Sequence, residues 1–291
     1  MDKWRQQLID TERGVFEVFA KGEGPPICVT HHYSVFNATG DYFAETFTPF
    51  CTVYLVNLRE AGQSAKAEQP YQLSMLETVF DLEAVRKALG FHQWIFAGHS
   101  TGGMLGVIYG IAASASLTGL MLVGAAARDY AAFSTVCIYN EDHPEFQKMQ
   151  DLLEALKQEG LEPEQRKELG IQRTKLSLHQ PDGYEQYFHG KHAKTISAIR
   201  LDFFSRELQV FDVTRKLHLI TVPVWIACGE HDVQCPLLYS LEMKEGIPNS
   251  QLAVFSKSNH YPFLEEKPKF VSDAQSFIAE VSHQNKAQMD V

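Results

Sequence analysis

The chain has 291 residues, of which 45% are hydrophobic and 21% are charged, the composition of a globular protein that can bury a large core. Its formal net charge of −10 at pH 7 argues against nucleic acid or an anionic membrane as a partner. The five cysteines are odd in number and contain no Cys-x-x-Cys pair, which suits unpaired thiols in a reducing compartment. The first residues hold no apolar leader, so we expect no secretory signal and a cytoplasmic location.

The chain up to Gly90 alternates between strand-like and helix-like segments. The predicted elements are, in chain order, strands at 6–13, 15–20 and 26–31, a helix at 42–48, a strand at 51–58 and a helix at 74–89. The first two strands are expected to form an antiparallel hairpin that turns at Glu12-Arg13-Gly14. Ser74 and Glu77 form a capping box, in which each side chain would bond the other residue's backbone N–H, and Gly90 ends that helix.

A glycine-rich turn joins the next predicted strand, at 92–97, to a helix over 104–109. The turn reads Gly98-His99-Ser100-Thr101-Gly102-Gly103, which matches the Gly-x-Ser-x-Gly pattern of a nucleophile elbow. A serine at the apex of such a turn has a strained backbone and a hydroxyl that points out of the sheet edge. The flanking glycines let strand and helix approach closely, and the helix N-terminus directs N–H groups toward an oxyanion. Ser100 is therefore a candidate nucleophile.

The segment 101–127 contains no charged side chain and is long enough to span a bilayer. Glycines interrupt it repeatedly, and Ser114, Ser116 and Thr118 break its apolar character near the middle. A buried helix followed by a buried parallel strand at 117–123 explains the segment better than a membrane span does.

The segment 128–215 is polar, charged and aromatic, with helical periodicity and no strand-like run. Helices are predicted there at 146–159, 163–178, 183–189 and 192–208. The sheet pattern then resumes, with strands predicted at 222–228 and 251–255 and helices at 237–245 and 269–281. Strands that alternate with helices predict a parallel sheet covered on both faces. We therefore divide the chain into an α/β core, residues 1–127 and 216–291, and an inserted all-helical cap, residues 128–215.

Two loops after the predicted cap offer partners for Ser100. A serine hydroxyl needs a base to take its proton, and the base needs a third group that fixes its tautomer. The strand at 222–228 runs into Gly229-Glu230-His231-Asp232, and the strand at 251–255 runs into Ser258-Asn259-His260. Both loops follow the carboxyl ends of parallel strands, where the sites of open α/β sheets form. We predict a triad of Ser100, Asp232 and His260; Glu230 suits the acid role less, because it lies nearer the strand end.

Other histidines indicate a metal site only weakly. His31 and His32 are neighbours in an extended segment, so their side chains should point to opposite faces. His189 and His192 have helical spacing, but Gly190 weakens a helix there and no carboxylate stands at ligand spacing. The elbow also lacks the Gly-Lys-Ser/Thr of a phosphate loop. We expect no metal and no cofactor.

Together these motifs resemble those of α/β-hydrolases with a helical cap, over almost all of residues 15–281. The marks of this resemblance are the elbow, Val222-Pro223 leading to Gly229-Glu230-His231-Asp232, Ile247-Pro248-Asn249 and Ser258-Asn259-His260. Within that superfamily the chain is most similar to prolyl iminopeptidase-like serine hydrolases, because of the double glycine of the elbow, the Gly-Glu-x-Asp-x-x-x-Pro run that ends at Pro236, and the position of the cap. Capped esterases, lactonases and C–C hydrolases share these marks.

The resemblance implies a cofactor-free serine hydrolase of small esters, amides or short peptides. The backbone N–H groups of Thr101 and Tyr33 would hold the oxyanion, with His31-His32 standing before Tyr33 in place of the family's usual His-Gly. In prolyl iminopeptidases, carboxylates of the cap hold the free amine of the substrate. Asp202 and Glu207 are the candidates for that role in this chain.

Two further classes share the same fold. One is a non-catalytic binding protein that keeps the pocket, against which an intact triad argues. The other is a lyase or cofactor-free oxygenase in which the histidine dominates and the serine is dispensable. A dehalogenase is disfavoured, because it would need a carboxylate at position 100.

Overall fold

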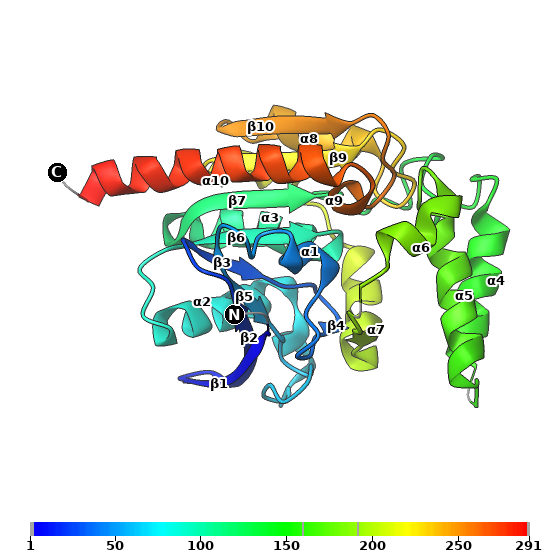
Figure 1. The fold of residues 1–291 in the computed structure, drawn as a ribbon, viewed down its shortest axis with the longest axis horizontal. Helices are drawn as coiled ribbons and strands as arrows, with labels where there is room; N and C mark the ends of the chain where they lie inside the picture. The colour runs from blue at the N-terminus through cyan, green and yellow to red at the C-terminus, as the bar shows by residue number, and fades with distance from the viewer. Residues whose placement is uncertain (1–2, 159, 191, 290–291) are drawn as a thin grey trace.

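A computed structural model describes residues 3–158, 160–190 and 192–289, with side chains up to residue 284. Its centre is an eight-stranded sheet in the order β1-β2-β5-β3-β6-β7-β9-β10 (Figure 1). The strands of this sheet are β1 (Arg5–Thr11), β2 (Gly14–Lys21), β3 (Pro26–Val29), β5 (Thr52–Val56), β6 (Trp94–His99), β7 (Leu117–Val123), β9 (Val224–Gly229) and β10 (Ser250–Phe255). Strand β2 runs antiparallel to both of its neighbours, and the other pairs are parallel. The predicted hairpin and the mostly parallel sheet are confirmed.

Helices cover both faces of this sheet. On one face lie α2 (Met75–Ala88), α3 (Thr101–Ala113) and α8 (Leu237–Gly246), and on the other lie α1 (Tyr42–Glu45) and α10 (Lys267–Met289). The sequence of β6 explains how one strand serves both layers, because successive side chains of a strand point to opposite faces. Phe96 packs in the first core, whereas Ile95 and Ala97 pack in the second.

The segment between β7 and β9 forms a separate layer over one end of the sheet. Its helices are α4 (Phe146–Lys157), α5 (Pro163–Lys175), α6 (Tyr184–Tyr187) and α7 (Ala198–Leu208). Figure 1 shows α4 and α5 side by side at the end toward which β7 and β10 point. The two ends of the segment are joined by backbone hydrogen bonds, from Asp129 N–H to Phe211 O (2.9 Å) and from Val213 N–H to Ala127 O (2.8 Å). The domain boundaries at 128 and 215 stay a prediction.

One part of this segment differs from its prediction. Residues 195–196 form a short strand, β8 (Thr195–Ile196), where a helix over 192–208 was expected. β8 pairs antiparallel with β4 (Ser34–Val35), and Ser197 N–H donates to Tyr33 O (2.9 Å). Because the backbone here bonds to a core strand distant in sequence, it is extended, and the helix begins only at Ala198. The inserted segment is therefore mostly helical rather than all-helical.

The start of α2 departs from its prediction in a smaller way. Ser74 Oγ accepts the N–H of Glu77 (3.3 Å), as a capping residue should. The Glu77 carboxylate, however, pairs with Arg13 (2.5 Å), and the Ser74 N–H donates to Tyr71 O. Only half of the predicted capping box forms, because a tertiary ion pair engages its second member.

The remaining described helices are short. They are α9 (Pro262–Glu265) and the 3-10 helices Pro70–Leu73, Ser114–Ser116, Pro181–Gly183 and Thr214–Leu219. Within the described ranges, no helix is both long and apolar enough to cross a membrane. The uncharged segment 101–127 begins with α3 and continues into β7, as predicted.

Candidate active site

Ser100 lies at the turn between β6 and α3, in a backbone conformation that residues other than glycine rarely adopt. Its φ is +57° and its ψ is −124°, a strained conformation for a residue with a Cβ atom. Hydrogen bonds hold this conformation in place: the Ser100 N–H donates to Val123 O (2.8 Å), and its carbonyl accepts the N–H groups of Gly103 and Met104. The side chain of Ser100 does not cap α3. The backbone of the predicted nucleophile elbow is thus present.

The glycines of the elbow are required by close packing. A Cβ atom on Gly98 would lie 2.1 Å from the Gly102 carbonyl oxygen, and one on Gly102 would lie 2.4 Å from Thr30 O. A Cβ atom on Gly103 would lie 2.5 Å from Ala125 Cβ. Real Cβ atoms do not approach other heavy atoms so closely, so any side chain at these positions would force the turn open.

His260 and Asp232 form a buried pair. His260 Nδ1 lies 2.9 Å from Asp232 Oδ2 and 3.0 Å from Oδ1, and the two residues are 2% and 1% exposed. Asp232 Oδ1 also accepts the N–H groups of Gln234 (2.9 Å) and Cys235 (2.8 Å), which fix the carboxylate. A carboxylate only accepts, so the proton of the imidazole lies on Nδ1, and Nε2 is left as an acceptor.

Gly124 and His99 connect this pair to Ser100. The backbone of Gly124 directly follows the carbonyl that receives the Ser100 N–H, and it has a φ of +53°. A Cβ atom there would lie 3.1 Å from Asp232 Oδ2 and 3.3 Å from His260 Nδ1. His99 directly precedes Ser100; its ring centre lies 4.5 Å from that of His260, and its Nε2 donates to the His260 carbonyl (2.8 Å). Ser100, Asp232 and His260 thus follow the carboxyl ends of β6, β9 and β10, and Gly124, which follows β7, lies between them.

The loop that carries His260 is held by two carboxylates. Glu265 accepts the Asn259 N–H (2.9 Å), and Glu266 accepts the Ser258 hydroxyl (2.7 Å). The inserted segment also contributes, because the His260 N–H donates to Ser177 O (3.2 Å). Sequence reasoning missed these contacts; the Glu265-Glu266 pair shortly after the histidine was the available signal.

The predicted oxyanion donors lie on either side of His31. Thr101 is the first residue of α3, so its N–H has no acceptor within that helix and faces the helix N-terminus. Thr101 Oγ1 is hydrogen-bonded to His31 Nε2 (3.1 Å), and the His31 ring packs edge-on against that of Tyr33 at 4.7 Å. Ser34 Oγ bonds the other ring nitrogen, and burial lowers the pKa of His31 to about 3, so the ring is neutral. The role of the Tyr33 N–H stays a prediction.

His31 and His32 have different surroundings. The carbonyl of His32 accepts Arg200 Nε, its ring lies 3.3 Å from another Arg200 nitrogen, and Phe204 packs beside it. Neither histidine is placed to chelate with the other. Within the ranges that the structure describes, no three His, Cys, Asp or Glu side chains gather as metal ligands.

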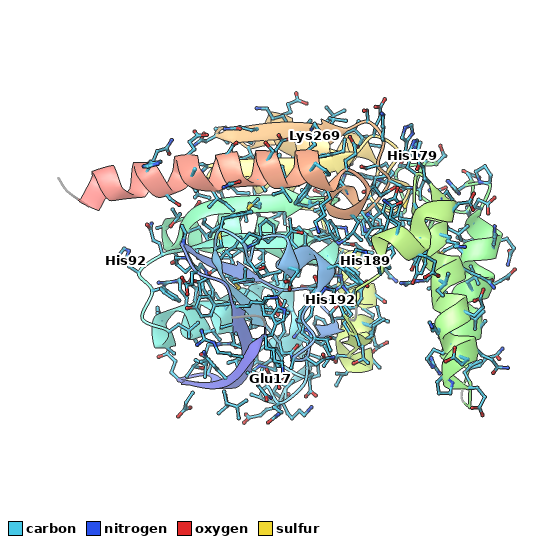
Figure 2. The ribbon with its side chains drawn as sticks, in the orientation of Figure 1. Glu17, His92, His179, His189, His192 and Lys269 are labelled. Carbon is cyan, nitrogen blue, oxygen red and sulfur yellow. The ribbon has the colours of Figure 1, made fainter. Side chains whose placement is uncertain are left out.

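A cavity of about 350 Å³ lies between the core and the inserted helices. On the core side its lining includes His31, His99 and Tyr261. His31 contacts Thr101, His99 is the last residue of β6 and directly precedes Ser100, and Tyr261 contacts His260. On the other side it is lined by one face of α5 and by residues around α6. His192, which is labelled in Figure 2 between the sheet and helices α4 and α5, also lines the cavity. A second void of about 10 Å³ borders Ser100 itself.

The two predicted amine-binding carboxylates lie elsewhere. Asp202 is exposed on α7 and pairs with Arg206 (2.5 Å). Glu207 accepts the Met75 N–H (3.0 Å) and so caps α2. Neither belongs to the described residues that line the cavity. Their positions give the predicted contact with a substrate amine no support.

Comparison with known proteins identifies the family of this chain. The sequence model of the alpha/beta hydrolase fold matches residues 31–267. An alpha/beta fold family hydrolase from Bacillus anthracis str. Sterne has a similar structure, with a TM-score of 0.90 and 40% sequence identity, covering 96% of this chain and 99% of that one. The AB hydrolase superfamily protein YisY of Bacillus subtilis (strain 168) is 28% identical over 266 residues, 90% of this chain and 93% of YisY. A proline iminopeptidase of Saccharolobus solfataricus is 35% identical over 71 residues, 24% of this chain and 23% of that protein. This chain belongs to the α/β-hydrolase fold family.

Proposed function

We propose that the protein is a serine hydrolase in which Ser100, His260 and Asp232 act as the catalytic triad. The observation that supports this best is the buried His260–Asp232 pair, 2.9 Å between Nδ1 and Oδ2, beside the strained turn of Ser100. With its Nδ1 proton held by Asp232, His260 keeps Nε2 available for the hydroxyl proton of Ser100.

The reaction has two balanced halves. The Ser100 oxygen attacks the substrate carbonyl while its proton passes to His260 Nε2; the C–O or C–N bond then breaks, and His260 protonates the leaving group. Water next attacks the acyl-Ser100 ester, with His260 again taking and returning a proton, and the carboxylic acid leaves. Asp232 stabilises the imidazolium that forms in each half.

The oxyanion of each tetrahedral intermediate would lie at the N-terminus of α3. Thr101 N–H is one donor, since it is free of intrahelical bonds, and Tyr33 N–H is the second. Removing one such donor costs about 2.7–4 kcal/mol of transition-state stabilisation in measured hydrolases.

The substrate class that we propose is a small ester or amide. A cavity of about 350 Å³ takes a compact acyl or leaving group and excludes a long polymer. The mostly helical layer over the strand ends limits access in the same way.

A prolyl iminopeptidase-like activity is the second candidate. Two proline iminopeptidases match parts of the chain, the one from Saccharolobus solfataricus and one from Lacticaseibacillus rhamnosus, which is 28% identical over 100 residues. That activity requires a carboxylate for the substrate's free amine. Among the described residues lining the cavity, Asp41 is the one carboxylate, and it is paired with Lys194 (3.0 Å). We therefore rank ester hydrolysis first.

A substrate panel tests these proposals. Purified protein is assayed with short-chain p-nitrophenyl esters and with prolyl-naphthylamide, each against a Ser100→Ala background. Ester turnover above that background supports the serine hydrolase, and turnover of the prolyl amide would favour the iminopeptidase branch. Activity that survives in Ser100→Ala and disappears in His260→Ala would instead indicate a hydrolase-fold lyase or oxygenase.

A further inference from the structure

Arg173 is a cation of the cavity wall that has no acidic partner among the residues that the structure describes. It lies on α5, whose residues Lys167, Gly170, Ile171 and Thr174 face the same cavity at helical spacing. In the described part of the chain, no carboxylate forms an ion pair with Arg173, and its surroundings are phenols and a histidine. A guanidinium is always charged, so this site carries an uncompensated positive charge.

Three of the titratable groups that interact electrostatically with Arg173, namely Tyr33, Tyr139 and His31, are neutral. Burial raises the pKa of Tyr33 and of Tyr139 above the usual phenol range, so both hydroxyls keep their protons at neutral pH. Burial lowers the pKa of His31 to about 3, which leaves that ring uncharged as well. None of these groups can serve as a counter-ion for Arg173.

The other charges of the cavity do not cancel this excess. Lys194 forms an ion pair with Asp41 (3.0 Å), so those two charges compensate each other. Lys167 and Arg173 also line the cavity, and neither forms an ion pair with a described carboxylate. The positive charge of this cavity is opposite in sign to the formal charge of the whole protein, which is −10. Such a cavity raises the local concentration of anions.

We propose that the substrate of this hydrolase carries a carboxylate, and that Arg173 is the residue that binds it. The inference rests on the proposed function and names its substrate class: an ester or amide with a second, ionised carboxyl group in the part that enters the cavity. A guanidinium suits a carboxylate because its parallel N–H donors bond both oxygens at once. The anion would also supply the counter-charge that no described residue provides beside Arg173.

Matched ester pairs test this directly. p-Nitrophenyl hydrogen glutarate is compared with p-nitrophenyl valerate, which places the carboxylate on the acyl side, and 4-acetoxybenzoate is compared with phenyl acetate, which places it on the leaving group. The readout is the ratio of kcat/KM for the anionic ester to that for the neutral ester. We expect a preference for the anion in at least one pair. Arg173→Gln should lower that ratio roughly tenfold to a hundredfold, the loss of a charge-assisted hydrogen-bonded pair.

Two variants control for folding and for charge alone. Arg166→Gln removes an arginine from the same helix, where it donates to Leu156 O outside the cavity, and should leave the ratio unchanged. Arg173→Lys keeps the positive charge but lacks the parallel N–H donors of the guanidinium, and it should retain part of the preference for the anionic ester.

A binding measurement keeps the inference independent of turnover. Glutarate is titrated by calorimetry into Ser100→Ala and into Ser100→Ala/Arg173→Gln. Glutarate binding that weakens by at least about tenfold in the double variant supports the carboxylate site. Ser100-dependent turnover with no anion preference in either pair overturns the inference while the serine hydrolase stands. Absence of Ser100-dependent turnover for every ester and amide tested would remove the proposed function, and absence of glutarate binding would then remove the inference as well.

Discussion

His99 Nε2 donates a hydrogen bond to the backbone carbonyl of His260 at 2.8 Å, and so joins the residue before the elbow serine to the loop of His260, the proposed catalytic base. Burial holds the pKa of His99 well below its usual value, so its ring is a neutral donor. His99 therefore contacts both the backbone and the ring of His260. We infer that His99 positions His260, a role that sequence reasoning did not single out.

Replacing His99 with phenylalanine should lower kcat about tenfold, because one hydrogen bond that fixes the His260 backbone is lost while the ring packing against Phe263 is kept. Steady-state kinetics on a p-nitrophenyl ester measure this effect. His92→Phe is the control, since His92 is exposed at the end of the sheet away from the cap (Figure 2). Equal kcat values for the His99 variant and wild type would show that His260 needs no such support.

Gly124→Ala should lower both stability and activity. The φ of +53° strains any alanine, and the new Cβ atom would lie 3.1 Å from Asp232 Oδ2 and 3.3 Å from His260 Nδ1. Gly90→Ala is the matched control, because Gly90 has a φ of +80° with nothing within 4 Å. Urea unfolding should show that the free energy of unfolding falls by about 1 kcal/mol in both variants. Only Gly124→Ala should lose kcat, and similar kinetics for the two would contradict the placement of the triad against this glycine.

Arg200 should contribute strongly to stability. This buried side chain joins α7 to the core by donating to the carbonyls of His32 and Arg59 and to the hydroxyl of Thr78. Arg200→Met would leave those acceptors buried and unpaired, and we expect a loss of about 3 kcal/mol in the free energy of unfolding.

Urea denaturation checks the stability of Arg200→Met, with Arg206→Met as the control because Arg206 is exposed on the same helix. The control should change the unfolding free energy by less than about 0.5 kcal/mol. Equal effects of the two substitutions would show that the buried contacts of Arg200 do not stabilise the docking of α7.

The stability of the protein should fall as the pH is lowered from the ordinary pKa of a histidine toward the lowered pKa of His31. Burial lowers the pKa of His31 from 6.5 to about 3, so between these values the unfolded chain binds a proton that the folded protein does not. Unfolding free energy therefore rises with pH across this window, by up to about 1.4 kcal/mol per pH unit for one such group. Urea unfolding at several pH values between 7.5 and 5 should show a shallower slope for His31→Gln than for wild type. Identical slopes would contradict a neutral His31 in the folded state.

Local sequence pattern predicted most of the sheet, since buried strands such as β7 are apolar runs bounded by turn residues. It failed at β8, whose two residues are exposed and extended only because β4 lies beside them. The positions of Asp232 and His260 followed from their places after parallel strands. The positions of Asp202 and Glu207 did not follow from spacing, because the face that α7 turns to the core depends on docking contacts such as the bond from Met75 N–H to Glu207. For the same reason, sequence could not show that Arg173 lines a cavity without a counter-ion.

Active-site labelling shows whether Ser100 is the nucleophile. Wild-type protein is treated with a fluorophosphonate probe, and the adduct is located by peptide mass spectrometry. We predict a single adduct on Ser100 that is absent from Ser100→Ala and strongly slowed in His260→Ala. Labelling that persists undiminished in Ser100→Ala would show that Ser100 is not the nucleophile.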